Sequence, residues 1–160
     1  MPARYWLFKS DPEAFSWADL LASPDQTTYW DGVRNYQARN FLRDEIQEGD
    51  LVLFYHSREK PPAVVGTARV TRSGYPDFTA WDPQDGHFDP KSDPDRPTWF
   101  MVDIQADQEF SRAIPLPELR STPGLENMEL LRKGSRLSVQ PVTRDEFEIV
   151  TGLGLGTGPA

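Results

Sequence analysis

Runs of aromatic and aliphatic residues recur along the chain and predict five short strands, over residues 3–9, 51–57, 63–70, 98–105 and 138–142. Gly66, inside the third run, indicates a bulge or a close approach of another backbone. Pro141 cuts the last run short. It favours an edge position for that strand, because proline cannot donate a hydrogen bond to a neighbouring strand.

Helices are expected between and after these strands, over residues 17–22, from 33 or 34 to 46, and after Thr143 as far as Gly152. Ser16 and Asp19 have capping spacing for the first helix, as do Thr143 and Glu146 for the last. Strands separated by short helices, with no regular βαβ repeat, predict an α+β fold. We expect a mixed sheet of about five to six strands, curled into a small barrel and flanked by short helices.

Residues 76–97 contain five prolines and six aspartates in twenty-two positions, too many breakers for a helix or a strand. The rings of Phe78, Trp81 and Phe88 predict partial order. The aspartate spacing does not match an EF-hand, so a solvated acidic loop is expected rather than a calcium site. Residues 1–150 are expected to form one domain, and residues 151–160, which are rich in glycine, a flexible tail.

Composition narrows the classes of protein that the chain can belong to. The 160 residues include no cysteine, which excludes disulfides, thiolate nucleophiles and cysteine-based zinc sites, and only two histidines. We therefore expect no metal and no cofactor. Neither a bilayer-spanning apolar stretch nor a secretion signal is apparent, so a cytoplasmic protein is expected, and association with the nucleoid stays open. A monomer is the expected state.

The net charge of −8 argues against a protein that tracks a long duplex. The first fifty residues hold nine acidic residues against five basic ones. Any contact with nucleic acid must therefore be local, through a few residues, with a shallow dependence on salt. A protein that recognises one nucleotide fits this balance.

Residues 30–43 differ from this acidic background, because they combine aromatic rings, side-chain amides, a glycine turn and three arginines. Such groups can hold a base and a phosphate together. Six further segments share an order with a known family, at residues 5–12, 51–57, 75–77, 89–92, 99–103 and 136–142. In these segments the chain resembles the EVE domain, a member of the PUA-like superfamily related in fold to the YTH and ASCH domains. The resemblance covers about residues 5–149 and implies a PUA-like barrel.

Trp30 is the first candidate site residue. It can be a core residue, since the chain has five tryptophans, or a pocket wall, since a tryptophan in the corresponding turn of the similar YTH fold cages a modified base. We favour the pocket. Arg34 at a helix start opposes the helix dipole and is the preferred phosphate or base contact, and Asn35 can bond a base edge. Arg39 and Arg43 are expected in helix-surface ion pairs.

Polar side chains at the ends of predicted strands complete the candidate site. A structural hydrogen bond explains His56 as readily as a role in binding does. Residues 132–136 are as readily explained by a solvated turn. Tyr55, Tyr75 and Trp81 are candidate second walls. The residues expected to bind the base or the nucleic acid are Lys9, Ser10, Trp30, Asp31, Val33, Arg34, Asn35, Tyr55, His56, Ser57, Tyr75, Arg136, Leu137 and Ser138.

The function expected from these residues and from the resemblance is binding of a modified nucleobase in an aromatic pocket. EVE-like proteins are associated with 5-methylcytosine and 5-hydroxymethylcytosine in DNA, and the superfamily includes proteins that bind RNA. The sequence does not choose between DNA and RNA, because no contact to a 2′-hydroxyl can be located.

Two other functions remain open. The similar ASCH fold includes amidohydrolases that act on modified cytidine, and Lys9 with Ser10, Thr67 and Glu13 could supply such chemistry. No convincing acid–base pair lies near the EVE-like segments, so an enzyme ranks second. An adaptor that binds protein through the loop at 76–97 ranks third.

Overall fold

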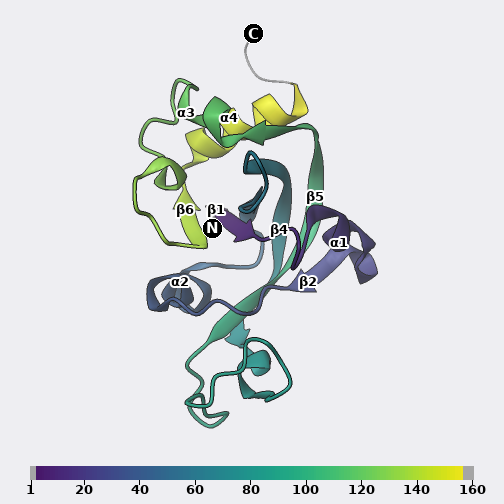
Figure 1. Ribbon diagram of the computed structural model, residues 1–160, viewed down its shortest axis with the longest axis vertical. Coiled ribbons are helices and arrows are strands. Elements are labelled where there is room, and N and C mark those ends of the chain that lie inside the picture. Colours follow the sequence, from purple (N-terminus) through teal and green to yellow (C-terminus); the bar gives the residue numbers. More distant parts are fainter. Residues whose placement is uncertain (1–2, 157–160) are drawn as a thin grey trace.

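The computed structural model describes residues 3–156 and has an α+β architecture, as predicted. Six strands form one mixed, strongly twisted sheet in the order β2-β5-β4-β3-β1-β6 (Figure 1). The strands are β1 (Tyr5–Ser10), β2 (Thr27–Tyr29), β3 (Leu51–His56), β4 (Ala63–Pro76), β5 (Phe100–Pro115) and β6 (Val139–Val142). In the described part of the chain, no helix is long and apolar enough to span a membrane.

The strand predictions located five of these six strands but misjudged the lengths of two. β4 and β5 form a hairpin of 14 and 16 residues, about twice the predicted length. Their outer halves carry polar residues, and the pairing shifts register at four places, which hides the alternation on which the prediction depended. β2 was missed, because three residues are too short for a periodic pattern. β6, which contains Pro141, lies at the sheet edge as predicted.

The centre of the sheet pairs β1 in parallel with β3, from Tyr5 opposite Leu51 to Ser10 opposite His56. Both strands are buried on both faces. Because successive side chains point to opposite faces, Phe8 belongs to one hydrophobic cluster and Leu7 to another. The cluster that contains Phe8 underlies the candidate site.

The first helix, α1 (Trp17–Ala22), begins at the predicted capping box of Ser16 and Asp19. It packs against β4 at Gly66, where an added Cβ would lie 2.7 Å from the Trp17 ring, and the pairing shifts register beside this glycine. An added Cβ would also lie 2.9 Å from the backbone carbonyl oxygen of Gln108, so the bulge or close backbone approach predicted at Gly66 is confirmed.

The second helix is shorter than predicted. α2 (Tyr36–Asn40) continues into one π-helical turn, η2 (Phe41–Glu45). Asn35 caps α2, since its side-chain oxygen accepts a hydrogen bond from the Ala38 N–H at 2.9 Å. Arg34 therefore precedes the helix instead of opening it, and the argument from the helix dipole does not apply to it.

The last helix, α4 (Arg144–Leu155), begins at the predicted capping box but passes the predicted stop at Gly152. Gly154 is buried, and an added Cβ would clash with the Phe110 ring. Glycine here serves close packing rather than helix termination, and the helix ends at Gly156, whose φ is +71°. Residues 151–155 thus correct the predicted flexible tail, and residues 157–160 of it lie outside the described residues. Four short elements were not predicted: α3 (Leu116–Arg120), η1 (Pro24–Gln26), η3 (Phe78–Trp81) and η4 (Glu129–Leu131).

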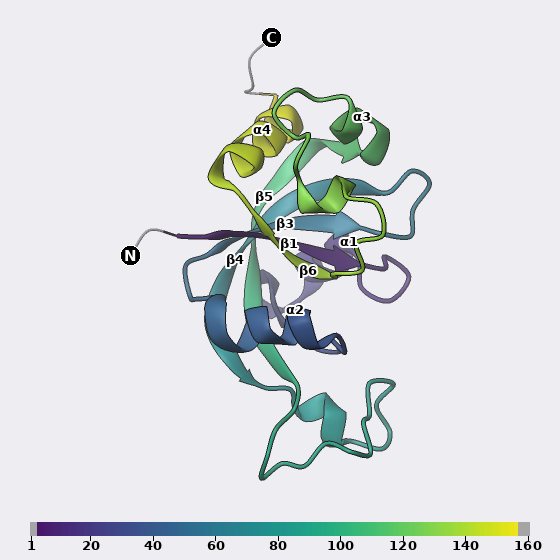
Figure 2. The same cartoon turned by 90° about the vertical axis from the view of Figure 1, so that its left-hand side faces the viewer.

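Residues 77–99 form the loop that joins β4 to β5 at the lower end of the molecule (Figure 2). It is irregular, as predicted, and mostly exposed. The Trp81 indole donates to the Ser92 hydroxyl at 3.1 Å, and the Trp99 indole donates to the Asp89 carboxylate at 2.7 Å. Asp77 departs from the predicted solvated loop, because it is only 1% exposed.

Candidate functional site

The end of β1, the start of β6 and the segment before α2 reach the same side of the molecule, above the tip of the 77–99 loop (Figure 2). Residues of these segments line a cleft of about 450 Å³. The predicted site residues in its lining are Lys9, Ser10, Trp30, Asp31, Val33 and Ser138. Sequence reasoning missed the other lining residues, which are Asp11, Ala14, Phe15, Thr28, Tyr29, Gly32 and His87.

One wall of the cleft is formed by β1 and the residues just before β6. The backbone N–H of Lys9 donates to the Ser138 carbonyl at 2.8 Å, which joins the two segments. Burial lowers the pKa of Lys9, and the nearby Glu129 carboxylate opposes that shift. The Ser10 hydroxyl donates to the Phe15 carbonyl, so this hydroxyl positions the neighbouring wall.

Trp30 forms part of the floor of the cleft and is also a core residue, so the two interpretations of this residue hold together. It is 9% exposed and packs against Phe8, Phe15 and Phe54 with ring-centroid distances of 5.3, 6.3 and 5.5 Å. The backbone N–H of Trp30 donates to the Val102 carbonyl at 2.7 Å, which continues the pairing of β2 with β5.

Asp77 attaches the 77–99 loop to the segment before α2. Its buried carboxylate accepts from the Gly32 N–H at 2.9 Å and from the Arg34 guanidinium at 3.0 Å. Burial would raise the pKa of Asp77, but hydrogen bonds from Thr79, Gly32 and Arg34, together with the Arg34 charge, hold it below its ordinary value. The carboxylate is thus held in its charged form by donors from two segments.

Arg34 was predicted to contact a phosphate or a base, but its donors are directed at the loop. Besides Asp77, the guanidinium donates to the His87 carbonyl at 2.6 and 3.2 Å. It also lies 5.3 Å from the centre of the Trp99 ring. The geometry gives Arg34 the role of a clamp between the loop and the start of α2.

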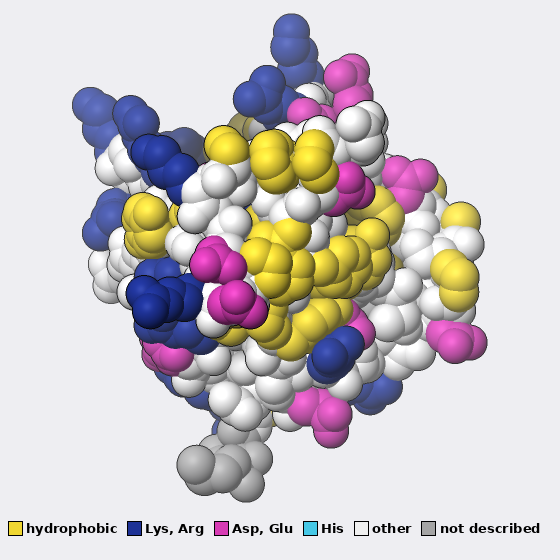
Figure 3. Space-filling view, turned by 90° about the horizontal axis from the view of Figure 1, so that it is seen from below, with side chains coloured by type: hydrophobic (Ala, Val, Ile, Leu, Met, Phe, Trp, Pro, Cys, Tyr) yellow, Lys and Arg dark blue, Asp and Glu magenta, His cyan; other side chains and the backbone are white. Residues whose placement is uncertain are grey.

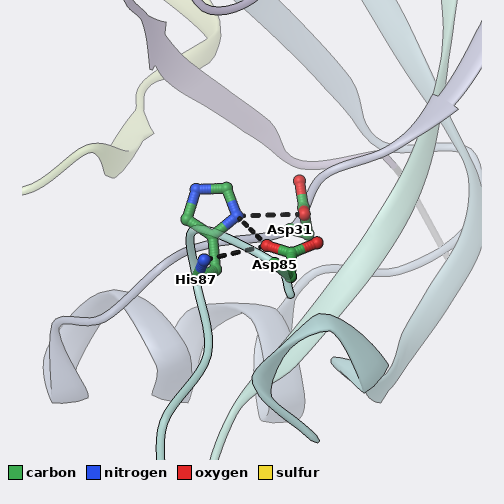
Figure 4. Close-up of side chains that lie close together, drawn as sticks. All are labelled: Asp31, Asp85 and His87. Atoms are coloured by element: carbon green, nitrogen blue, oxygen red, sulfur yellow. Dashed lines mark hydrogen bonds and ion pairs between the residues drawn. The ribbon is translucent and has the colours of Figure 1, made fainter. Parts of the chain in front are cut away.

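His87 lies at the tip of the loop between two carboxylates (Figure 4). Its Nδ1 is 3.2 Å from Asp31 and 3.3 Å from Asp85. Its ring packs on Gly32, whose φ is +78° and where an added Cβ would lie 2.5 Å from Nε2. The potential ligand atoms of Asp31, Asp85 and His87 lie within 4.8 Å of one another, the spacing of a cation site. Ion pairing between the histidine and the carboxylates accounts for the same arrangement.

The Asp31 carboxylate faces the cleft from this cluster. Burial raises its pKa, the His87 charge opposes the shift, and the charges on Asp77 and Asp85 raise the pKa further. Neither Asp77 nor His87 was a predicted site residue. The sequence could have pointed to Asp77 as a site residue, because it directly follows Pro76 in the segment at 75–77, which carried part of the resemblance.

The predicted group at the end of β3 lies outside the cleft lining. Tyr55 is buried in the hydrophobic cluster on the opposite face of the sheet. The Nε2 atom of His56 accepts a hydrogen bond from the backbone N–H of Trp17 at 3.0 Å, and its Nδ1 lies 3.2 Å from Glu59. The structural interpretation of this histidine is therefore correct. The Ser57 hydroxyl donates to the Ser10 carbonyl at 3.3 Å, behind the cleft wall.

Other predicted contacts are also explained by neighbours within the fold. The Tyr75 hydroxyl donates to Asp103, and Trp81 bonds Ser92, so neither ring lines the cleft. Arg136 is exposed beside the lining, whereas Leu137 is buried in the core. Asn35, predicted to bond a base edge, is instead the α2 cap.

Of the two arginines that were predicted to form helix-surface ion pairs, one forms such a pair and the other does not. Arg43 pairs with Asp44 at 2.7 Å, as predicted. Arg39 donates to the Thr98 carbonyl at 2.7 Å and lies 5.2 Å from the centre of the Tyr36 ring, so the ion pair predicted for it is replaced by contacts with the loop end and a ring.

The four residues considered for amidohydrolase chemistry are not gathered at one place. Lys9 and Ser10 line the cleft, but Thr67 and Glu13 do not. The buried Thr67 hydroxyl accepts from the Gln108 N–H at 3.2 Å, and Glu13 is exposed on the surface.

The sequence and the structure both resemble known proteins over nearly the whole chain. Human thymocyte nuclear protein 1 is 45% identical over 166 residues, which cover 93% of this chain and 73% of that protein. The structure of a hypothetical protein from Leishmania major superposes with a TM-score of 0.90 and 43% identity, covering 96% and 95% of the two chains. The crystal structure of human THYN1 in complex with 5-methylcytosine-containing DNA gives a TM-score of 0.89 and 44% identity, covering 95% and 98%. The EVE domain model matches residues 4–153. This chain therefore belongs to the EVE domain family.

Proposed function

We propose that this protein binds DNA locally and holds one modified cytosine in the cleft formed by β1, β6 and the segment before α2. The observation that carries the proposal is the match, over 95% of this chain, to the human THYN1 structure that contains 5-methylcytosine DNA. The cleft supplies a place of suitable size, since its volume of about 450 Å³ lies within the ~300–1,000 Å³ typical of small-molecule sites.

The chemistry of the lining suits a base with an exocyclic amino group, such as cytosine. A carboxylate is the acceptor that suits the exocyclic amino group of cytosine, and Asp31 presents one, half-buried, in the cleft. Lys9 offers a donor for the base carbonyl or a phosphate on the opposite wall. The edge of Trp30 gives the base an aromatic neighbour.

The charge balance supports contact with one nucleotide rather than with a long backbone. The net charge is −8, and Arg34 is already paired with Asp77. We expect few phosphate contacts and therefore a shallow fall of affinity with rising salt.

Recognition of the added group has a limited energy. Burial of one methyl group contributes about 0.8 kcal/mol, or a factor of roughly four. A hydroxymethyl group can also form a hydrogen bond, and a site built for that bond can discriminate more sharply.

The test is a titration of short single- and double-stranded oligonucleotides that carry cytosine, 5-methylcytosine or 5-hydroxymethylcytosine, with RNA versions of each. Asp31→Asn and Lys9→Gln probe the two polar walls. Trp30→Phe probes the indole, because phenylalanine keeps an aromatic ring in the core, whereas alanine would leave a large cavity there. Arg43→Gln is the control, since Arg43 pairs with Asp44 away from the cleft. Binding of a modified cytosine that weakens in Asp31→Asn but not in Arg43→Gln supports the proposal. Equal binding of all the oligonucleotides, or binding of none, contradicts it.

A binding role also fits the arrangement better than the amidohydrolase chemistry found in the similar ASCH fold. Only two of the four residues considered for that chemistry line the cleft. Incubation with an N4-acylated cytidine, followed by chromatography, tests the point, and turnover that Lys9→Gln abolishes would favour the enzyme.

A further inference from the structure

Two exposed aromatic rings meet at the rim of the cleft. The exposed large hydrophobic side chains among residues 3–156 are Tyr29, Tyr36, Phe78 and Phe88. Tyr29 is 45% exposed and Phe78 is 47% exposed. Their ring centroids lie 5.2 Å apart at an interplanar angle of 63°. The contact covers only part of each ring, and the remaining surface faces solvent.

The backbone on both sides of this pair is firmly held. Tyr29 ends β2, pairs with Asp103 of β5, and directly precedes Trp30 in the cleft. Phe78 directly follows Asp77, the buried anchor of the loop on Gly32. The rings are therefore carried by a strand and by an anchored turn, so little freedom is lost when a ligand binds them.

The other two exposed rings differ in their surroundings. Tyr36 stacks on Trp99 with centroids 5.0 Å apart and has Arg39 beside it, so its neighbours account for its position. Phe88 is 39% exposed in the loop and does not line the cleft. Hydrophobic side chains also gather near the centre of the lower face of the molecule, with charged side chains of both signs around them (Figure 3). The Tyr29–Phe78 pair is the exposed ring pair that adjoins the cleft, since Tyr29 belongs to both.

We propose that Tyr29 and Phe78 form a second binding subsite, which stacks the base of the nucleotide next to the one in the cleft. This inference rests on the proposed function. A base that leaves its stack also deprives its neighbour of a stacking partner. An aromatic ring can replace that partner for any of the four bases, because each has a π face. The subsite therefore adds affinity without adding sequence preference.

The test combines a change in the DNA with a change in the protein. The probe is a pentadeoxynucleotide with a central 5-methylcytosine, compared with versions in which the 5′ or the 3′ neighbour is an abasic residue. We expect wild type to bind the intact probe roughly 5- to 150-fold more tightly than one of the abasic versions, the range for stacking one base on a ring. In Phe78→Ala this ratio falls towards one, and in Phe88→Ala it is retained.

Each outcome decides one point. The subsite is overturned if the ratio of affinities for the intact and abasic probes is the same in Phe78→Ala as in wild type. It is also overturned if this ratio is near one in wild type for both neighbours. In both cases, binding of the intact probe leaves the proposed function standing. No binding of the intact probe by wild type overturns the proposed function and the subsite with it. Because the readout is a ratio within each protein, a general loss of folded protein does not alter it.

Discussion

Replacement of Asp77 by asparagine tests whether the 77–99 loop is held to the site by one buried carboxylate. The substitution keeps the shape of the side chain but removes its charge. One side-chain oxygen can still accept from the Thr79 N–H, as Oδ1 does at 2.9 Å. The amide nitrogen then faces the Gly32 N–H and the Arg34 guanidinium, which are donors and cannot bond it.

The expected cost follows from the two bonds that are lost. Hydrogen bonds to charged groups contribute about 1.5–3 kcal/mol each, and loss of one partner of a buried ion pair costs about 3–5 kcal/mol. The Arg34 side chain is 25% exposed, so solvent screens part of this interaction. We therefore expect Asp77→Asn to lower the free energy of unfolding by about 2–4 kcal/mol, which corresponds to a Tm lower by about 5–15 °C for a chain of this size.

Urea unfolding followed by tryptophan fluorescence measures the loss, and limited proteolysis reports whether the loop opens first. Asp82→Asn is the matched control, because Asp82 is exposed in the same loop and accepts one local hydrogen bond, from Gln84. We expect the control to lie within about 0.5 kcal/mol of wild type. An Asp77→Asn variant as stable and as resistant to protease as the control would refute the assignment of Asp77 as the anchor.

The dependence on pH gives a second check on the same residue. The pKa of Asp77 is lower in the folded protein than its ordinary value of 3.8. A depressed pKa stabilises the fold above the unfolded pKa, and this contribution disappears as pH falls through the folded pKa. The difference between wild type and Asp77→Asn should therefore be constant near neutrality and shrink below about pH 3.8. A difference that persists unchanged at the lowest pH would point to shape rather than charge.

Three further predictions concern packing and the cleft. In thermal melts, Gly154→Ala should lower the stability by about 1–3 kcal/mol, since the new Cβ would clash with the Phe110 ring. Gly86→Ala is the control and should be neutral, because there is open space around Gly86. Trp30→Ala should cost about 3–5 kcal/mol in urea unfolding, because it empties the core, and stability equal to that of wild type would contradict its packing. Asp31→Asn should weaken binding of modified cytosine roughly tenfold at neutral pH. The pKa of Asp31 is raised above its ordinary value of 3.8, so as the pH decreases the affinity of wild type should begin to fall while the pH is still above 3.8. An equal fall in Asp31→Asn would exclude Asp31 as the titrating group.

The sequence predicted those parts of the fold that depend on local chemistry. Ser16 and Thr143 mark the starts of α1 and α4 because a cap is a hydrogen bond within four residues. The outer halves of β4 and β5 have no such local signal, since their pairing follows from a distant partner strand. Gly152 was misinterpreted for a related reason. A glycine can mark the end of a helix or lie buried within one, and α4 continues past Gly152 because its buried face packs against distant parts of the chain, as Gly154 does against Phe110.

The sequence located the polar residues of the cleft at the paired ends of β1 and β6, but it was wrong at the end of β3 and where the assembled loop decides the contacts. Lys9, Ser10 and Ser138 lie together because β1 and β6 are neighbours. Arg34 has the expected location near the cleft but a different partner, because a carboxylate 43 positions away reaches it. His87 carried no sequence signal, since its place in the cleft depends on the path of an irregular loop.

The pairing of β1 with β6 has a consequence for the order in which the protein folds during synthesis. Tyr5 pairs with Val142, so β1 leaves the ribosome well before β6, the partner strand on one of its sides. Until then one side of β1 is an unpaired strand edge beside exposed core side chains, a form prone to aggregate. Because Lys9 and Ser138 belong to these two ends of the chain, the cleft itself is among the last features to form. Nascent chains that stop before residue 139 should therefore retain much of the hairpin of β4 and β5 but lack one wall of the cleft.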